Sequence, residues 1–116
     1  MQIFATCGSP EKRQFLIEEH GIAADHIFSS RDTSFGRQIR EKTNNRGIDV
    51  ILNSLSGDLL HESWSCIASC GRFIEIGKRD IVLSGSLNMK FFDRNSTFST
   101  VDLSELWLAR NPVLIE

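Results

Sequence analysis

The sequence predicts an α/β fold in which helices cover both faces of a parallel sheet, giving three layers. Short apolar runs alternate with helical patterns of about 10 residues, as they do in consecutive β–α units. The 116 residues amount to one domain at most, and no internal repeat or Gly/Ser linker interrupts them. The composition, 41% hydrophobic and 24% charged, is typical of a globular domain with a modest core.

The first β–α unit has clear local signals. We predict a strand over residues 2–6, followed by a tight turn. Ser9 is a suitable N-cap, and Pro10 suits the first position of a helix. The helix is expected to run to residue 19 or 20 and to stop at Gly21, because glycine readily takes the left-handed conformation that closes helices.

The next two units follow the same pattern. A strand over 26–29 precedes a helix capped by Thr33 or Ser34. Its apolar face recurs at every fourth residue, namely at Phe35, Ile39 and Thr43. After turn residues, a strand over 50–53 leads to a helix capped by Asp58. The apolar stripe of that helix is predicted to be Leu60, Trp64, Ile67 and Ala68.

The remaining chain completes the alternation. Gly71 is expected to end the preceding helix, and strands are predicted over 72–76 and 96–103, with a long loop between them. The tail from Ser104 is predicted to form a helix that ends near Pro112. No G-x-G-x-x-G phosphate loop occurs, although a dinucleotide-binding sheet normally opens with a strand and such a loop. The sequence therefore predicts a Rossmann-like parallel sheet that is truncated, with its first strand and Gly-rich loop missing.

Charge, hydropathy and cysteine usage exclude several functions. The net charge of −2 argues against nucleic-acid binding, and no apolar run is long enough to span a membrane. The start of the chain lacks the layout of a signal peptide, which indicates a cytoplasmic protein. The three cysteines, Cys7, Cys66 and Cys70, are expected to be reduced, small buried residues. With only His61 near the last two, no metal site is predicted.

The turn after the first strand is a candidate phosphate site. Gly8 and Ser9 are followed by Lys12 and Arg13, and the turn has no acid before Glu11. In dinucleotide-binding folds an acid at this place grips the ribose hydroxyl of NAD, whereas cations suit the additional phosphate of NADP. The alternative is a capped, solvated helix start with no ligand.

Polar residues also follow two later strands. Asn53 and Ser54 lie at the end of one, where they could touch a nicotinamide, although an ordinary strand–turn–helix joint would look the same. Lys78 follows a buried strand and Gly77, so that desolvation could lower its pKa and make it a proton donor. Asp102 would lie beside it at the end of the next strand. A structural salt bridge is an equally good interpretation.

Several other charged and titratable side chains have no predicted functional role. We interpret Arg79, Asp80 and Arg94 as solvated loop charges. The histidines, His20, His26 and His61, have no acid–base partner in the sequence and are interpreted as structural.

With these residues identified, the sequence resembles the enoyl reductase domain of iterative, highly reducing polyketide synthases. The enoyl reductase of animal fatty acid synthase is similar, and both belong to the zinc-free branch of the medium-chain dehydrogenase/reductase superfamily. Four segments carry the resemblance in the right order: HIFSSRDTSF, GIDVILNSLSG, GRFIEIGKRDI and STFSTVDL.

The resemblance implies roles for particular residues. Lys78 and Asp102 match the proton-donating pair of the family, and Lys12 matches the lysine that binds the adenosine 2′-phosphate of NADPH. The segment from Ser29 to Arg31 falls where relatives also approach that phosphate. Ser54 and Ile76 match positions that line the nicotinamide half of the cofactor, and no metal ligands are implied. Together with the candidates from the turns and strand ends, the predicted cofactor-binding residues are Gly8, Ser9, Lys12, Ser30, Arg31, Asn53, Ser54, Ile76 and Gly77.

The resemblance also implies a reaction. In the family, hydride passes from NADPH to the β-carbon of an α,β-unsaturated acyl thioester, and the enolate is protonated at the α-carbon. Some relatives assign that proton to a tyrosine of the substrate domain, and this chain contains no tyrosine, so the donor stays open. Residues 1–116 would be a partial NADP-binding domain without the catalytic substrate domain. Without the central first strand, its neighbours are expected to pair anew or to leave exposed edges.

The implied partners are an enoyl thioester tethered to an acyl carrier and the other domains of a megasynthase. Alone, the chain is expected to reduce no enoyl thioester. Two alternatives remain: a quinone-oxidoreductase-like reductase of free enones, and a non-catalytic nucleotide-binding remnant. Binding to nucleic acid or to a membrane is not expected.

Overall fold

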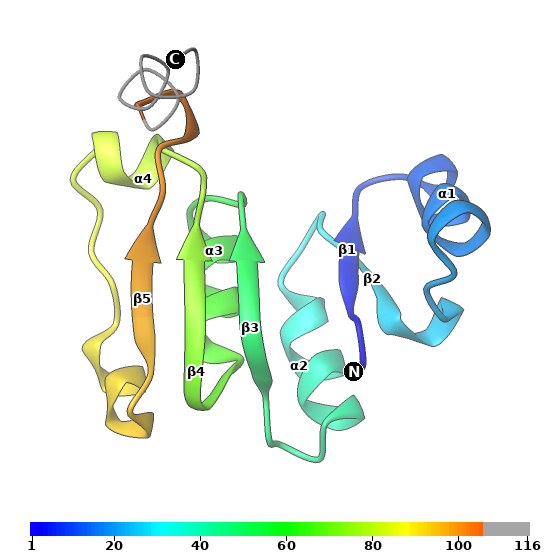
Figure 1. The fold of residues 1–116 in the computed structure, drawn as a ribbon, viewed down its shortest axis with the longest axis horizontal. Coiled ribbons are helices and arrows are strands. Elements are labelled where there is room, and N and C mark those ends of the chain that lie inside the picture. The colour runs from blue at the N-terminus through cyan, green and yellow to red at the C-terminus, as the bar shows by residue number, and fades with distance from the viewer. Residues whose placement is uncertain (106–116) are drawn as a thin grey trace, which may run out of the picture. The chain divides into compact units, whose positions relative to one another are not determined.

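The computed structural model describes residues 1–105, and these form two compact units (Figure 1). The first unit is Met1–Gly47, and the second begins at Ile48. Each has its own parallel sheet, a two-stranded one in the first unit and a three-stranded one in the second. The predicted α/β fold with parallel strands is confirmed.

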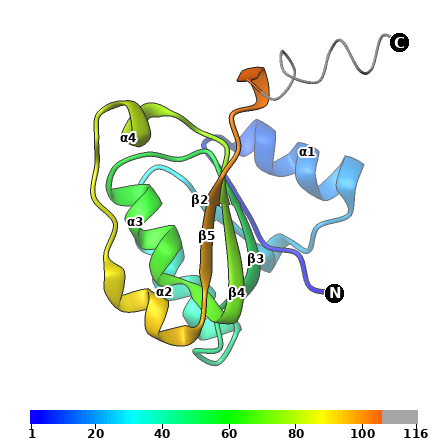
Figure 2. The same ribbon diagram turned by 60° about the vertical axis from the view of Figure 1, so that its left-hand side comes forward.

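The first unit pairs β1 (Ala5–Cys7) with β2 (Ile27–Ser29) in parallel. Helices α1 (Pro10–His20) and α2 (Ser34–Lys42) lie on opposite sides of this small sheet (Figures 1 and 2). A short 3-10 helix, η1 (Ala24–His26), leads into β2.

The ends of α1 are as predicted from the sequence. The Ser9 hydroxyl accepts a hydrogen bond from the Lys12 backbone N–H at 3.3 Å, and Gly21 closes the helix with φ of 63°. The start of α2 is different: within the described residues, the Thr33 side chain makes no capping bond. Instead, the Asp32 carboxylate accepts from the backbone N–H of Ser34 at 3.0 Å. An acceptor two residues upstream therefore satisfies the free N–H of this helix.

The second unit contains the sheet β3 (Ile48–Asn53), β4 (Ile67–Glu75) and β5 (Thr97–Thr100), in that spatial order and parallel throughout. Helix α3 (Asp58–Ser65) connects β3 to β4. A short helix α4 (Arg79–Val82) and a 3-10 helix η2 (Met89–Arg94) occupy what the sequence analysis treated as a long loop. The predicted tail helix falls largely on residues 106–116, outside the described range.

The core of the second unit is aromatic and lies on one face of its sheet. The Trp64 ring is fully buried and meets the rings of Phe73 and Phe98 edge-on at 5.7 and 5.5 Å. On strand β3, Val50 and Leu52 are 64% and 69% exposed. Strand β3 is one of the two edge strands of this sheet, and these two apolar side chains lie on the same exposed face of it.

The predicted helix from Asp58 to Gly71 is wrong in its second half. The helix ends at Ser65, and Ile67 and Ala68 belong to β4. Four apolar residues at helical spacing were assigned to one stripe, but two of them are buried as part of a strand. Gly71 is needed for close packing rather than for a helix end, since a Cβ there would lie 2.8 Å from the Ala68 carbonyl oxygen.

Because α3 ends at Ser65, Cys66 and Cys70 do not lie on one helix, contrary to the prediction from the sequence. Cys66 is buried, as predicted, but Cys70 is exposed, with a positive φ of 60°. The burial predicted for Cys70 is therefore wrong, because the chain turns outward in the irregular part of β4.

Arg94 is a structural side chain and not a solvated loop charge. Its guanidinium donates to the carbonyl oxygens of Ser65 and Ile67, at 3.1 and 2.8 Å, and stacks over the Phe91 ring. It thereby ties η2 to the junction between α3 and β4.

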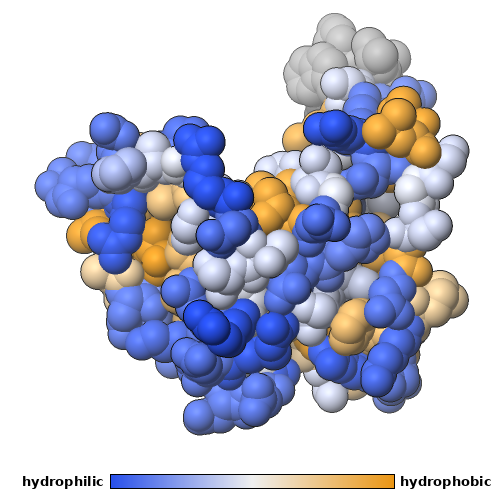
Figure 3. All heavy atoms as spheres, turned by 180° about the vertical axis from the view of Figure 1, so that it is seen from behind, coloured by the Kyte–Doolittle hydropathy of each residue, from blue (hydrophilic) through white to orange (hydrophobic). Residues whose placement is uncertain are grey.

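The surface seen in Figure 3 is largely hydrophilic, with an apolar patch at the upper right, toward α4. Three consecutive apolar residues of this segment are exposed: Ile81 at 52%, Val82 at 73% and Leu83 at 67%. Within the described part of the chain, no helix is long and apolar enough to cross a membrane.

Candidate functional site

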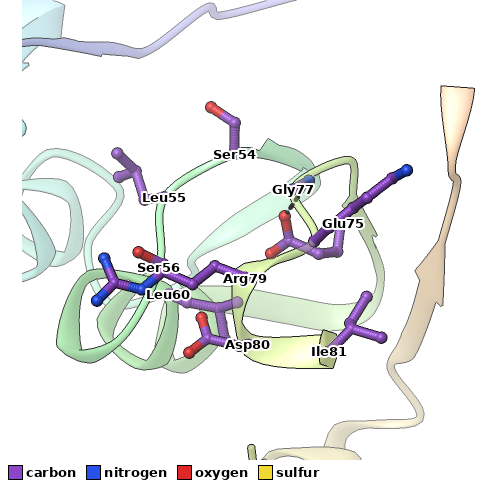
Figure 4. A pocket seen from close by; sticks show the side chains of 10 residues that line it. Ser54, Leu55, Ser56, Leu60, Glu75, Gly77, Arg79, Asp80 and Ile81 are labelled. Atoms are coloured by element: carbon purple, nitrogen blue, oxygen red, sulfur yellow. Dashed lines mark hydrogen bonds between the residues drawn. The ribbon is translucent and has the colours of Figure 1, made fainter. Parts of the chain in front are cut away.

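The sequence-predicted residues gather at two places, one in each unit. Because β3, β4 and β5 are parallel, their carboxyl ends meet at one edge of the sheet, where open α/β sheets bind ligands. That edge carries a pocket of about 80 Å³ (Figure 4). Its lining consists of Ser54, Leu55, Ser56, Leu60, Glu75, Gly77, Lys78, Arg79, Asp80 and Ile81.

Lys78 and Asp102 form an ion pair at this edge. The Lys78 Nζ lies 2.6 Å from the Asp102 Oδ2, as expected for residues that follow adjacent parallel strands. The ammonium, together with a hydrogen bond from the Glu105 backbone N–H, lowers the pKa of the Asp102 carboxyl from its ordinary value. The side chains are 51% and 37% exposed, so the burial expected around Lys78 is not present here. Their catalytic role stays a prediction.

Asn53 and Gly77 lie at this edge but are engaged internally. The Asn53 side chain is 3% exposed, and its Nδ2 donates to the Leu55 carbonyl oxygen at 2.8 Å. The Ile76 backbone N–H donates to the Asn53 carbonyl oxygen at 2.9 Å. The exposed Ser54 side chain points away from the carboxylate of Glu75 in Figure 4. Within residues 1–105 the Ser54 hydroxyl has no hydrogen-bond partner, so it is available to a ligand.

Glu75 is the residue of this site that the sequence analysis missed. It was placed in an apolar run, and its side chain is indeed 2% exposed. Its Oε2 accepts from the Asn53 Nδ2 at 2.6 Å, and its Oε1 accepts from the Gly77 backbone N–H at 2.7 Å. The alternation of side chains along a strand could have identified it, because Phe73 and Glu75 are two residues apart and therefore point to the same buried face of β4.

Asp80 also has a structural partner, so its assignment as a solvated charge is wrong. Its Oδ2 accepts from the backbone N–H of Gly57 at 2.9 Å. Gly57 occupies the N-cap position of α3 with a φ of 62°, a conformation that favours glycine. The predicted cap, Asp58, is the first residue of the helix, and no side-chain cap bond forms within the described residues. The carboxylate that accepts from the start of α3 thus belongs to α4, after β4.

The predicted phosphate-binding residues lie together in the first unit. The Arg31 Nε donates to the Gly8 carbonyl oxygen at 2.8 Å, which holds the turn after β2 against the turn after β1. A pocket of about 360 Å³ opens beside them, lined by Thr6, Cys7, Gly8, Lys12, Phe15, Leu16 and Ser30. Ser9 begins α1, whose N-terminus carries positive dipole charge.

This donor set fits the phosphate of a nucleotide. The side chains of Lys12 and Arg31 are cationic, and Ser30 adds a hydroxyl at the pocket wall. Metal binding has no comparable arrangement in residues 1–105, where no three His, Cys, Asp or Glu side chains are placed to hold an ion.

Known proteins match this chain over most of its length. A family model described as zinc-binding dehydrogenase matches residues 22–111. The highly reducing polyketide synthase fogA of Aspergillus ruber is 54% identical over 110 residues, 95% of this chain. The squalestatin tetraketide synthase of a Phoma species is 53% identical over 99% of the chain. The chain spans only 5% and 4% of the lengths of these relatives.

A solved structure agrees with this assignment. The nucleotide-binding subdomain of the enoylreductase domain of PpsC from Mycobacterium tuberculosis superimposes with a TM-score of 0.84 and 34% identity. The alignment covers 95% of this chain and 60% of that one. The chain belongs to the zinc-binding dehydrogenase family, and the resemblance to polyketide synthase enoyl reductase domains that was inferred from the sequence is confirmed.

Proposed function

We propose that this chain is the NADPH-binding part of an enoyl reductase that reduces α,β-unsaturated acyl thioesters in polyketide biosynthesis. The relatives are named as highly reducing polyketide synthases, and the solved neighbour is an enoylreductase subdomain. The observation that carries the proposal is the 2.6 Å contact of Lys78 with Asp102 at the carboxyl edge of the sheet. An ammonium held by a carboxylate at a ligand-binding edge is suited to deliver a proton.

The choice of NADPH rests on the first unit. Lys12 and Arg31 supply two positive charges close to the N-terminus of α1, and the turn before that helix carries no acid. A carboxylate at this place would bind a ribose hydroxyl but repel a 2′-phosphate. The residues present favour the phosphorylated cofactor through charge-assisted hydrogen bonds.

The chemistry assigns different tasks to the two residues of the pair. When bound, NADPH supplies the hydride that reduces the β-carbon. The Lys78 ammonium gives a proton to the α-carbon of the enolate, so that one N–H bond breaks and one C–H bond forms. Asp102 accepts the remaining N–H of the amine, which keeps the nitrogen at the sheet edge while water returns the proton.

The wider setting of this reaction is also part of the proposal. A carrier-tethered enoyl thioester is the substrate, and the other domains of a cytoplasmic megasynthase are the partners. The large size of the relatives supports this setting.

A fluorescence titration tests the cofactor assignment. The purified chain is titrated with NADPH and NADH, alone and as the Lys12→Ala variant. We expect saturable binding that prefers NADPH and an affinity at least about tenfold lower in the variant, because a hydrogen bond to a charged group contributes about 1.5–3 kcal/mol. Lys42→Ala is the matched control, since Lys42 is a cation of the same unit that pairs with Asp25 at 2.9 Å.

Equal affinity for the two cofactors, or an unchanged affinity in Lys12→Ala, would contradict the choice of NADPH. Reduction of carrier-tethered thioesters and of free enones is then compared with the catalytic substrate domain supplied, since the chain alone is expected to reduce no enoyl thioester. Preference for free enones would favour a quinone-oxidoreductase-like enzyme instead.

A further inference from the structure

Glu75 connects the ends of all three strands of the second unit. Through its side chain it accepts from Asn53, the last residue of β3, and from the backbone of Gly77 beyond β4. Through its own carbonyl oxygen it accepts from the Val101 N–H at 2.9 Å, one residue before Asp102. One residue therefore fixes the two segments that carry Lys78 and Asp102.

Packing alone does not explain a carboxylate at position 75. Glu75 is among the largest fully buried side chains of the chain, together with Trp64 and Phe73. Burying a carboxylate is unfavourable unless its oxygens are hydrogen-bonded, and an apolar residue of similar size would fill the space without that cost. Both oxygens of Glu75 accept a donor, which is the pattern of an ionised carboxylate.

The contact with the following turn is close. A Cβ on Gly77 would lie 2.9 Å from the Glu75 Oε1 and 3.2 Å from the Ser54 carbonyl oxygen. The turn therefore approaches the carboxylate as near as only glycine allows. Lys78 follows directly, with a side chain that is half exposed and receives no support from burial.

We infer that Glu75 is a positioning residue: its buried carboxylate fixes the turn at Gly77 against the end of β3 and so holds Lys78 against Asp102. Its importance for catalysis rests on the role of Lys78 in the proposed function. The positioning itself is a property of this unit and can be tested without cofactor.

The test uses the Glu75→Gln variant of the chain, followed by nuclear magnetic resonance. Glutamine keeps the shape but replaces one acceptor oxygen by an NH2 group, which only donates, so a single oxygen remains for the two N–H groups. We expect amide hydrogen exchange at Gly77 to become at least tenfold faster. We also expect the titration of the Asp102 carboxyl to move up toward its ordinary range, because Lys78 is no longer held against it.

A second substitution restores the complementarity. In Asn53→Asp with Glu75→Gln, the new aspartate accepts from the glutamine amide, whose oxygen again accepts from Gly77. We expect the Asp102 titration to return toward that of the natural chain, although the bond to the Leu55 carbonyl oxygen is lost. Ile67→Val is the control, because it removes one core methyl group without touching the network, and Asp102 should not respond.

Faster exchange at Gly77 with an unchanged Asp102 titration would overturn the inference, since Glu75 would then be structural only. If Glu75→Gln does not fold, Gly77→Ala provides the same test by pushing the turn away from the carboxylate. Here too an unmoved Asp102 overturns the inference, and an upward shift supports it. Failure of the chain to bind NADPH would contradict the proposed function but leave these two readouts intact.

Discussion

The two units hold their candidate ligand-binding residues in different ways. In the first, Lys12 lines an open pocket, Arg31 is bonded to Gly8 in the wall of that pocket, and among the described residues of α1 none is buried. In the second, a buried aromatic core supports an edge whose polar groups are bonded to one another through Glu75. The first unit is thus suited to recognise a ligand by charge, and the second by the fixed geometry of strand ends.

The largest expected effect is a loss of stability, and it tests whether the second unit is more tightly packed than the first. Trp64→Ala removes the fully buried ring at the centre of the second unit, and we expect the free energy of unfolding to fall by about 3–5 kcal/mol. Phe15→Ala in α1 is expected to change it by less than about 1 kcal/mol, because that ring is 54% exposed. Urea denaturation measures both, and similar losses would mean that the packing of the two units does not differ in this way.

Substituting one glycine in each unit compares how closely the backbone is packed at the two candidate sites. Gly77→Ala brings a Cβ to 2.9 Å from the Glu75 Oε1, and we expect a loss of about 1–3 kcal/mol from overpacking. In Gly8→Ala the new Cβ meets the flexible Arg31 side chain at 3.4 Å and the Ser30 hydroxyl at 3.6 Å, and the change is expected to be nearly neutral. Thermal unfolding followed by circular dichroism compares them. A neutral Gly77→Ala would show that the turn can move away from the carboxylate.

The smallest effect concerns an exposed ion pair from each unit, Lys42 with Asp25 and Lys78 with Asp102. Hydrogen bonds from Lys78 to Asp102 and from Lys42 to Asp25 each lower the pKa of the carboxyl below its usual 3.8. Because these folded-state pKa values are depressed, each pair stabilises the fold above pH 3.8. That contribution is lost as the pH falls through the lower folded value.

Carboxyl carbon titrations by nuclear magnetic resonance check this prediction. We expect Lys78→Met to raise the titration midpoint of Asp102 alone, and Lys42→Met to raise that of Asp25 alone. A midpoint at or above 3.8 for Asp102 in the natural chain would mean that the ion pair does not persist in solution.

Local sequence signals were sufficient where an element depends on its own residues. Ser9, Pro10 and Gly21 define α1 because a cap, a first-turn proline and a left-handed glycine act within a few residues of each other. The pairing of Lys78 with Asp102 was also predictable, since parallel strands bring their carboxyl ends to one edge.

The sequence was insufficient where apolar spacing fits two structures. Ile67 and Ala68 continue the stripe of Leu60 and Trp64, yet the chain leaves the helix at Ser65 and enters β4. Burial alone does not distinguish a helix face from a strand face over so short a stretch.

Local pattern and chain connectivity thus suffice to predict the alternation of the main strands and helices, their parallel direction and the residues that reach the carboxyl edge, but not α4 and η2. The side-chain partners of Glu75, Asp80 and Arg94 depend on tertiary contacts, because they lie 22 to 29 residues away in the chain. The physical reason is that a charged residue reads as solvated until the fold places a complementary donor or acceptor beside it.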